Sequence, residues 1–101
     1  MSYLLQGKID AKTGKTEALA QVLLEASQLV ANAKGCRLYV IAKNDAEAHS
    51  VYVTEIWDSK QDHDDSLKNP EVRALIMQAI PLVEGQPAKG LELQILGGKG
   101  A

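Results

Sequence analysis

The segment Val51–Trp57, with the sequence VYVTEIW, constrains the fold most, because it has the composition of a β-strand that is apolar on both faces. Side chains along a strand alternate between the two faces of its sheet, so the valines and Trp57 share one face while Tyr52 and Ile56 share the other. Glu55 is the charged residue of the segment, and it lies on the face of Trp57. A carboxylate is costly to bury unless it is paired or used, so Glu55 marks a candidate functional site.

Hydrophobic spacing and turn residues predict an alternation of strands and helices around this segment. Gly35 is a candidate left-handed cap of the first helix. Ser59 and Asn69 are candidate N-caps of two further helices, the second with Pro70 at its first position. The order β-α-β-β-α-β predicts an α+β, ferredoxin-like sandwich with an antiparallel sheet, in a single domain spanning residues 1–101. The predicted elements are strand Tyr3–Ile9, turn Asp10–Gly14, helix Lys15–Ala33, strand Arg37–Lys43, turn Asn44–Ser50, strand Val51–Trp57, a helix from Ser59, a helix from Asn69 to Ile80, loop Gly85–Gly90 and strand Leu91–Ile95.

The face of the sheet away from the helices is expected to need a cover. A four-stranded sheet with helices on one face leaves its other face open. Leu38 and Val40 lie on one side of the first hairpin strand, opposite Tyr39, so this strand too is apolar on both sides. Monomers rarely expose a continuous apolar patch of this kind, and we therefore predict a homodimer, sheet against sheet. The last strand, Leu91–Ile95, alternates apolar and polar residues and is expected to have one buried face.

Composition and charge exclude several function classes. The chain has 101 residues, of which 46% are hydrophobic and 24% are charged, with a formal net charge of −2. Without a basic excess it has no surface suited to a phosphate backbone, so no nucleic acid partner is expected. No segment is long and apolar enough to span a membrane, and the N-terminus MSYLLQGKID lacks the features of an export signal. The single cysteine, Cys36, fits a reducing compartment, so we expect a cytoplasmic protein.

Short motifs spread along the chain occur in a specific order. They are Gly35-Cys36, Tyr39, Glu55-x-Trp57-x-Ser59, Asn69-Pro70-Glu71-Val72-Arg73, Pro81-Leu82 and Gly97-Gly98. As an ordered set they resemble the antibiotic biosynthesis monooxygenase-like domains of the dimeric α+β barrel group, over nearly the whole chain. The resemblance implies a small homodimer with a cavity between the sheet and the helices of each subunit. Some members of that family oxidise polycyclic phenols, anthrones or quinols with molecular oxygen and without metal or flavin, while others have no established activity.

Two positions depart from the family pattern. Many members carry a histidine in the first helix after the tryptophan strand, at the position of Ser66, whereas this chain has His63 about one turn earlier. Haem-degrading relatives resemble one another in an asparagine on the first strand and a histidine on the later helix. Here Gly7 takes the first position and the segment from Val72 to Ile80 contains no histidine. Haem degradation is therefore not expected, and no cofactor is predicted.

Glu55, Trp57 and His63 are the candidate catalytic residues. Trp57 follows Glu55 on the same strand face, and His63 lies about one and a half turns into the following helix. Oxygenation without a cofactor needs a dry pocket, a base that deprotonates a phenol or enol, and a donor that stabilises charged oxygen. Either Glu55, with its pKa raised by burial, or His63 can be the base, and Trp57 would stack on the substrate or donate its indole N–H. Further substrate contacts are predicted from Tyr39, Tyr52, Val53, Ser66 and Arg73.

Each of these residues also has a purely structural interpretation. Glu55 can be neutralised by Arg73, Trp57 can be core packing, and the charged face QDHDD can leave His63 solvated. His49 and His63 are well separated and lack further ligands, so no metal site is predicted. Three functions remain open: a cofactor-independent monooxygenase of quinols, anthrones or related aromatic molecules, a non-catalytic small-ligand-binding or interaction module, and an isomerase-like proton shuttle.

Overall fold

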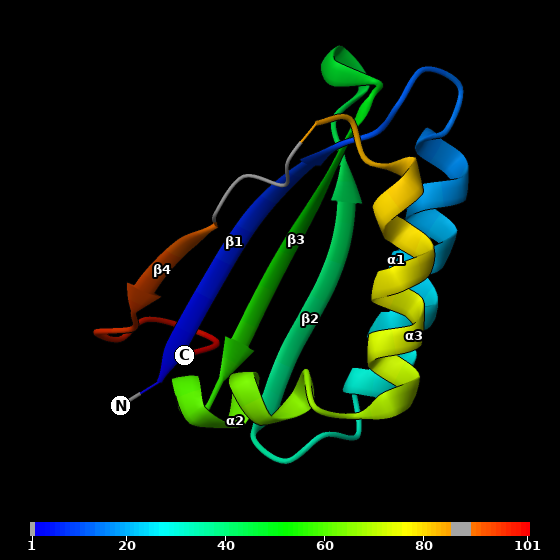
Figure 1. Cartoon of the computed structure of the whole chain (residues 1–101). Coiled ribbons are helices and arrows are strands. Elements are labelled where there is room, and N and C mark those ends of the chain that lie inside the picture. Colours follow the sequence, from blue (N-terminus) through cyan, green and yellow to red (C-terminus); the bar gives the residue numbers. More distant parts are fainter. Residues whose placement is uncertain (1, 86–89) are drawn as a thin grey trace.

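Helices cover one face of an antiparallel four-stranded sheet in the computed structural model, which describes residues 2–85 and 90–101 (Figure 1). Residues 86–89 of the predicted loop Gly85–Gly90 lie outside the described part. The described elements are β1 (Tyr3–Asp10), α1 (Thr16–Val30), β2 (Cys36–Lys43), the 3-10 turn η1 (Asp45–Glu47), β3 (Ser50–Trp57), α2 (Lys60–Ser66), α3 (Pro70–Ala79), the 3-10 turn η2 (Ile80–Leu82) and β4 (Leu91–Gln94). The strand order β2-β3-β1-β4 confirms the predicted ferredoxin-like architecture.

The predicted helix starts are confirmed by their caps. The backbone N–H of Asp62 donates to Ser59 Oγ at 3.1 Å, and the N–H of Glu71 donates to Asn69 Oδ1 at 2.8 Å. These side chains satisfy backbone donors that the first turn of a helix leaves without an intrahelical partner. Pro70 follows the second cap, where its fixed φ and missing N–H cost little.

The stretch between α1 and β2 is tighter than the sequence indicated. α1 ends at Val30, three residues earlier than predicted, because the N–H of Ala33 turns back to the carbonyl of Val30 at 2.9 Å. Gly35 has a φ of 80°, as expected of a left-handed cap. A Cβ at this glycine would lie 2.2 Å from the Asp62 carboxylate, so a side chain here would force the Asp62 side chain to move.

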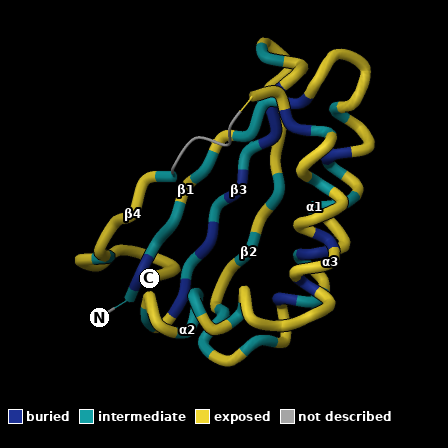
Figure 2. The backbone as a smooth tube through the Cα atoms, viewed as in Figure 1, coloured by how far each residue is buried: buried dark blue, intermediate teal, exposed yellow. Residues whose placement is uncertain are grey.

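β3 is a central strand, hydrogen-bonded to β1 on one side and to β2 on the other. Its register places Glu55 beside Leu5 of β1 and Tyr39 of β2. The odd-numbered residues of β3 are buried under the helices, while Tyr52 and Ile56 on the other face are only partly buried (Figure 2). The two faces assigned to this strand from its alternation are therefore confirmed.

The face of the sheet away from the helices is apolar and exposed in the subunit. Leu38 is 37% exposed and Val40 is 45% exposed. The last strand contributes Leu91 and Leu93 to this face, because its register places them beside Gln6 and Leu4 of β1. They are 62% and 44% exposed, so the prediction that β4 has one buried face is wrong within the subunit.

The core under the helices consists of two separate clusters. The first gathers Tyr3, Val30, Trp57 and Val72 near the start of β1. The second gathers Ala11, Leu19, Val51 and Val83 near its end. Within the described residues, no helix combines the length and the apolar character that crossing a membrane requires.

Candidate active site

A cavity of about 240 Å³ lies between the sheet and the helices. Four of its lining residues carry polar side chains, and these are Tyr39, Glu55, His63 and Ser66. The remaining lining residues are apolar and come from β1, α1, the end of α2, α3, η2 and Val83 just after η2. Glu55 and His63 therefore open into one cavity.

Glu55 is held on the helix-facing side of the sheet, where it is 7% exposed. Trp57, which is fully buried, donates its indole N–H to Glu55 Oε1 at 3.0 Å. Burial raises the pKa of the Glu55 carboxyl above its ordinary value, and the hydrogen bond from Trp57 and the charge of His63 act in the opposite direction. The result is a desolvated carboxyl whose proton affinity exceeds that of a surface glutamate.

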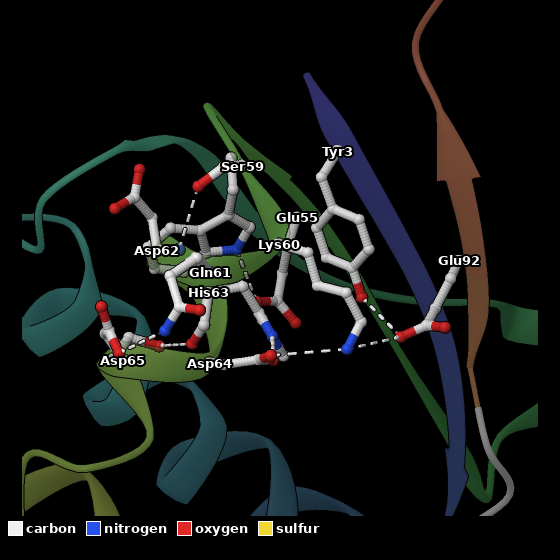
Figure 3. Close-up of polar contacts among 12 residues, drawn as sticks. Tyr3, Glu55, Ser59, Lys60, Gln61, Asp62, His63, Asp64, Asp65 and Glu92 are labelled. Carbon is white, nitrogen blue, oxygen red and sulfur yellow. Dashed lines mark hydrogen bonds and ion pairs between the residues drawn. The ribbon is translucent and has the colours of Figure 1, made fainter. Parts of the chain in front are cut away.

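His63 projects from α2 toward the same carboxyl, with its Nε2 atom 3.8 Å from Glu55 Oε1 (Figure 3). Its Nδ1 atom lies 2.9 Å from Asp64 Oδ1. This contact lowers the pKa of the Asp64 carboxyl, so the carboxylate is ionised and accepts a hydrogen bond from the Nδ1–H group. The arrangement orients Nε2 toward Glu55. The ring also packs edge-on against Trp57, with the centroids 5.8 Å apart.

A chain of charged groups continues from His63 to the surface (Figure 3). Lys60 Nζ lies 3.4 Å from Asp64 Oδ2 and 3.8 Å from Glu92 Oε1. Tyr3 donates its hydroxyl to the same Glu92 oxygen at 3.0 Å. Burial and the neighbouring Glu92 raise the pKa of Tyr3 to about 12, so Tyr3 stays neutral. Proton acceptors thus extend from buried Glu55 to solvent-exposed side chains.

Tyr39 and Ser66, two of the predicted substrate contacts, also line the cavity. Tyr39 sits beside Glu55 in the sheet, and burial followed by the charge of Glu55 raises its pKa. Its hydroxyl is therefore a neutral hydrogen-bond donor. Ser66 Oγ donates to the backbone carbonyl of His63 at 2.6 Å, which ties the end of α2 to its middle.

The other predicted site residues do not line the cavity. Trp57 is buried beneath Glu55 and His63, so it contacts the candidate base and not the space a substrate would occupy. Val53 shares its strand face but is also outside the lining. Tyr52 lies on the opposite face of the sheet, because its position along β3 has the other parity. Arg73 is exposed on α3 and outside the lining. In the described part of the chain it forms no ion pair with Glu55, so it does not neutralise that carboxylate.

Sequence reasoning missed Asp64, which orients the histidine. A carboxylate next to His63 in the chain was the available signal. The described residues contain no group of three or more histidine, cysteine or acidic side chains that could hold a metal ion.

The family model of the antibiotic biosynthesis monooxygenases matches residues 2–78. The chain belongs to this family. No curated protein gives a significant match. The family match supports a monooxygenase-like function in general terms, and antibiotic biosynthesis monooxygenase domains are typically dimeric.

Solved structures of this family's fold cover nearly the whole chain. A protein of Chloroflexus aurantiacus J-10-fl, provisionally assigned as an antibiotic biosynthesis monooxygenase, is 32% identical over 97% of this chain and 96% of its own, with a TM-score of 0.86. Rv0793 of Mycobacterium tuberculosis is 16% identical over 98% and 99%, with a TM-score of 0.86. A mutant of SnoaB, a cofactor-independent oxygenase of Streptomyces nogalater, is 9% identical over 97% and 96%, with a TM-score of 0.81. The last two likenesses show the shared fold.

Proposed function

We propose that this antibiotic biosynthesis monooxygenase domain oxygenates a quinol or a related phenolic or enolic molecule with O₂ and without a cofactor. The observation that carries the proposal is the position of Glu55, a buried carboxyl with a raised pKa that opens into an apolar cavity beside His63. A general base works best when its pKa lies near the working pH, and burial moves Glu55 in that direction.

The first step is removal of the substrate hydroxyl proton by Glu55. His63 faces this carboxyl through Nε2 and is oriented by Asp64, so it takes the proton onward toward the solvent. The neutral Tyr39 side chain lines the same cavity, and its hydroxyl stabilises the remaining substrate oxyanion by a hydrogen bond. Trp57 acts as a positioning residue, because its indole N–H holds Glu55 in place.

The phenolate anion then supplies the electrons for the oxidation. It transfers one electron to O₂, and the resulting radical pair combines to form a new carbon–oxygen bond. Cleavage of the O–O bond leaves one oxygen atom on the ring and releases the other as water. For a quinol the balance is quinol plus O₂ giving hydroxyquinone plus water, in which the four electrons that reduce O₂ all come from the substrate. The apolar lining keeps water away from the radical pair.

We also propose that the domain works in the cytoplasm, as a single-domain homodimer paired through the open face of the sheet. The exposed leucines and valine on that face form the apolar patch that a second sheet would cover. Cys36, the single cysteine, is not part of a disulfide in the subunit.

The same cavity suits a non-catalytic binding module, and its largely apolar lining favours this second function. The two are separated by incubating metal-free and flavin-free protein with a panel of quinols and anthrones under ¹⁸O₂. We expect saturable oxygen uptake, with one labelled atom in the product and one in water, and loss of this uptake in Glu55→Gln but not in the surface control Glu84→Gln. Heat-denatured protein gives the spontaneous background. Uptake at background rates with every substrate would contradict the oxygenase and leave the binding module.

A further inference from the structure

The cavity is polar at one end and apolar along the rest of its length. Glu55 lies level with Leu5 of β1, whereas Ile9, which also lines the cavity, lies four residues further along the same strand. Strands rise by about 3.3 Å per residue, so the cavity extends about 13 Å beyond the carboxyl. Tyr39, His63 and Ser66 gather with Glu55, and every other lining side chain is apolar.

The cavity lies between the two core clusters. Val30 and Val72 of the first cluster line the cavity, and so do Leu19 and Val83 of the second. A ligand in this space therefore touches both clusters and replaces the packing that a continuous core would have. Only a hydrocarbon group is complementary to this apolar lining, because a polar atom there would lose its hydrogen bonds to water without gaining a partner.

The mouth of the cavity is apolar as well. Ile76 and Ile80 on the side of α3 and Leu67 at the end of α2 belong to the lining and are 41%, 54% and 42% exposed. An incoming molecule thus meets a hydrophobic rim. Its reactive end must still travel to Glu55, where the polar groups lie.

We infer that the ligand of this cavity is a head-and-tail molecule: a single-ring phenol or quinol whose hydroxyl meets Glu55 and whose hydrocarbon substituent runs along the apolar end toward Ile9. In a fused three-ring anthrone the reacting carbon and the carbonyl lie across the middle of the long axis. Aligned with the cavity, such a molecule places these groups beside leucine, valine and alanine side chains. The inference rests on the proposed function in taking this cavity as the substrate site.

The test is a series of 4-alkylphenols from methyl to nonyl, with the dissociation constant of each measured by calorimetry in the absence of O₂ so that no turnover occurs. Each buried methylene contributes about 0.8 kcal/mol, so affinity should rise about fourfold per carbon and then level off once the chain reaches Ile9. No dependence on chain length, or tighter binding of a hydroxyanthrone than of the best alkylphenol, would overturn the head-and-tail ligand.

Two variants fill the apolar end, and a third is their control. Ile9→Phe and Ala79→Leu add bulk to the lining, and we expect the levelling-off to move to shorter chains while 4-methylphenol binds as before. Two positions are used so that the test survives if one variant folds poorly. Met77→Leu on the exposed side of α3 is outside the lining and should leave the whole series unchanged. If filling either position weakens the methyl and the long-chain ligands equally, the tail does not occupy this end.

Turnover of the matching alkylhydroquinones separates this inference from the proposed function. Oxygen uptake whose kcat/KM rises with chain length supports both. Oxygen uptake without a chain-length trend overturns the head-and-tail ligand and leaves the oxygenase. A chain-length trend in binding with no oxygen uptake overturns the oxygenase and leaves the head-and-tail ligand.

Discussion

The two faces of β3 share one backbone and have different chemistry. Toward the helices the strand presents buried valines, Glu55 and Trp57, and this side contains the cavity and the network of titratable groups. Toward the open side it presents Tyr52, Thr54 and Ile56 among exposed leucines of β2 and β4. The first face excludes water through its own subunit. On the second face water would be excluded by a partner molecule. The candidate active site and the proposed pairing surface are therefore separated by the thickness of one sheet.

Glu55→Gln is the strongest way to test the helix side. The amide keeps the size of the side chain but cannot accept the substrate proton, so kcat/KM should fall by about 10²–10⁴-fold, the usual contribution of a general base. The dimer should persist, because the residue faces away from the pairing surface. Oxygen-electrode kinetics and sedimentation velocity measure the two effects. A variant that keeps its activity removes Glu55 from the mechanism.

Val40→Glu tests the open side by introducing a carboxylate, where the first variant removes one. A carboxylate in a sheet-to-sheet interface is desolvated without a partner, at a cost of several kcal/mol, so the dimer dissociation constant should rise by at least about 10²-fold. Leu24→Glu is the matched control, since this α1 residue is 41% exposed and lies on the helix layer. Sedimentation equilibrium over a dilution series compares the three proteins. Equal association of both variants would place the interface elsewhere.

Trp57→Phe sharpens the comparison, because it removes the hydrogen bond that supports Glu55 but retains the Glu55 carboxyl itself. The base must be ionised, so kcat/KM falls as pH drops through the pKa of Glu55. The indole hydrogen bond lowers that pKa, so its loss should move the acidic limb of the profile to higher pH. The variant should also lose at least about 1 kcal/mol of unfolding free energy, because the hydrogen bond is lost and the smaller ring leaves a gap in the core. An unshifted limb, at unchanged stability, would mean that the limb belongs to another group.

Replacing Tyr52 and Tyr39 by phenylalanine, one at a time, compares the two faces of the sheet, and the smallest effect on activity is expected from Tyr52 on the open face. Tyr52→Phe lies on the open face and should leave kcat/KM within about twofold, as surface changes away from a site usually do. Tyr39→Phe removes a hydrogen-bond donor beside Glu55 and should lower kcat by about tenfold or more. Steady-state kinetics of the pair decides. A larger effect from Tyr52 would mean that the open face takes part in catalysis.

Much of this arrangement was predictable because it depends on local rules. Side-chain parity along β3 places Glu55 and Trp57 under the helices, and the caps at Ser59 and Asn69 place α2 and α3. The same parity rule shows that Tyr52 cannot share a face with Glu55, so this part of the predicted site conflicted with a signal already present in the sequence.

Other features depend on contacts between distant segments. The apolar side of β4 faces outward because of its register with β1, which no local pattern encodes. Asp64 contacts His63 although neighbouring helix residues point apart, since the side chains turn back on each other. The cavity itself arises from how far α3 lies from the sheet, and helix spacing cannot be derived from periodicity alone.

The division of the core into two clusters also concerns the protein's fate in a cell. The cavity leaves the interior of the folded chain incompletely packed, and a bound ligand would fill it. A ligand that binds only the folded form adds about 2.7 kcal/mol at a concentration of one hundred times its dissociation constant. Cellular proteases degrade the unfolded fraction of a protein, so protein with ligand bound in the cavity would be degraded more slowly than protein without it. The amount of this protein would then follow the supply of its ligand, with no dedicated regulator.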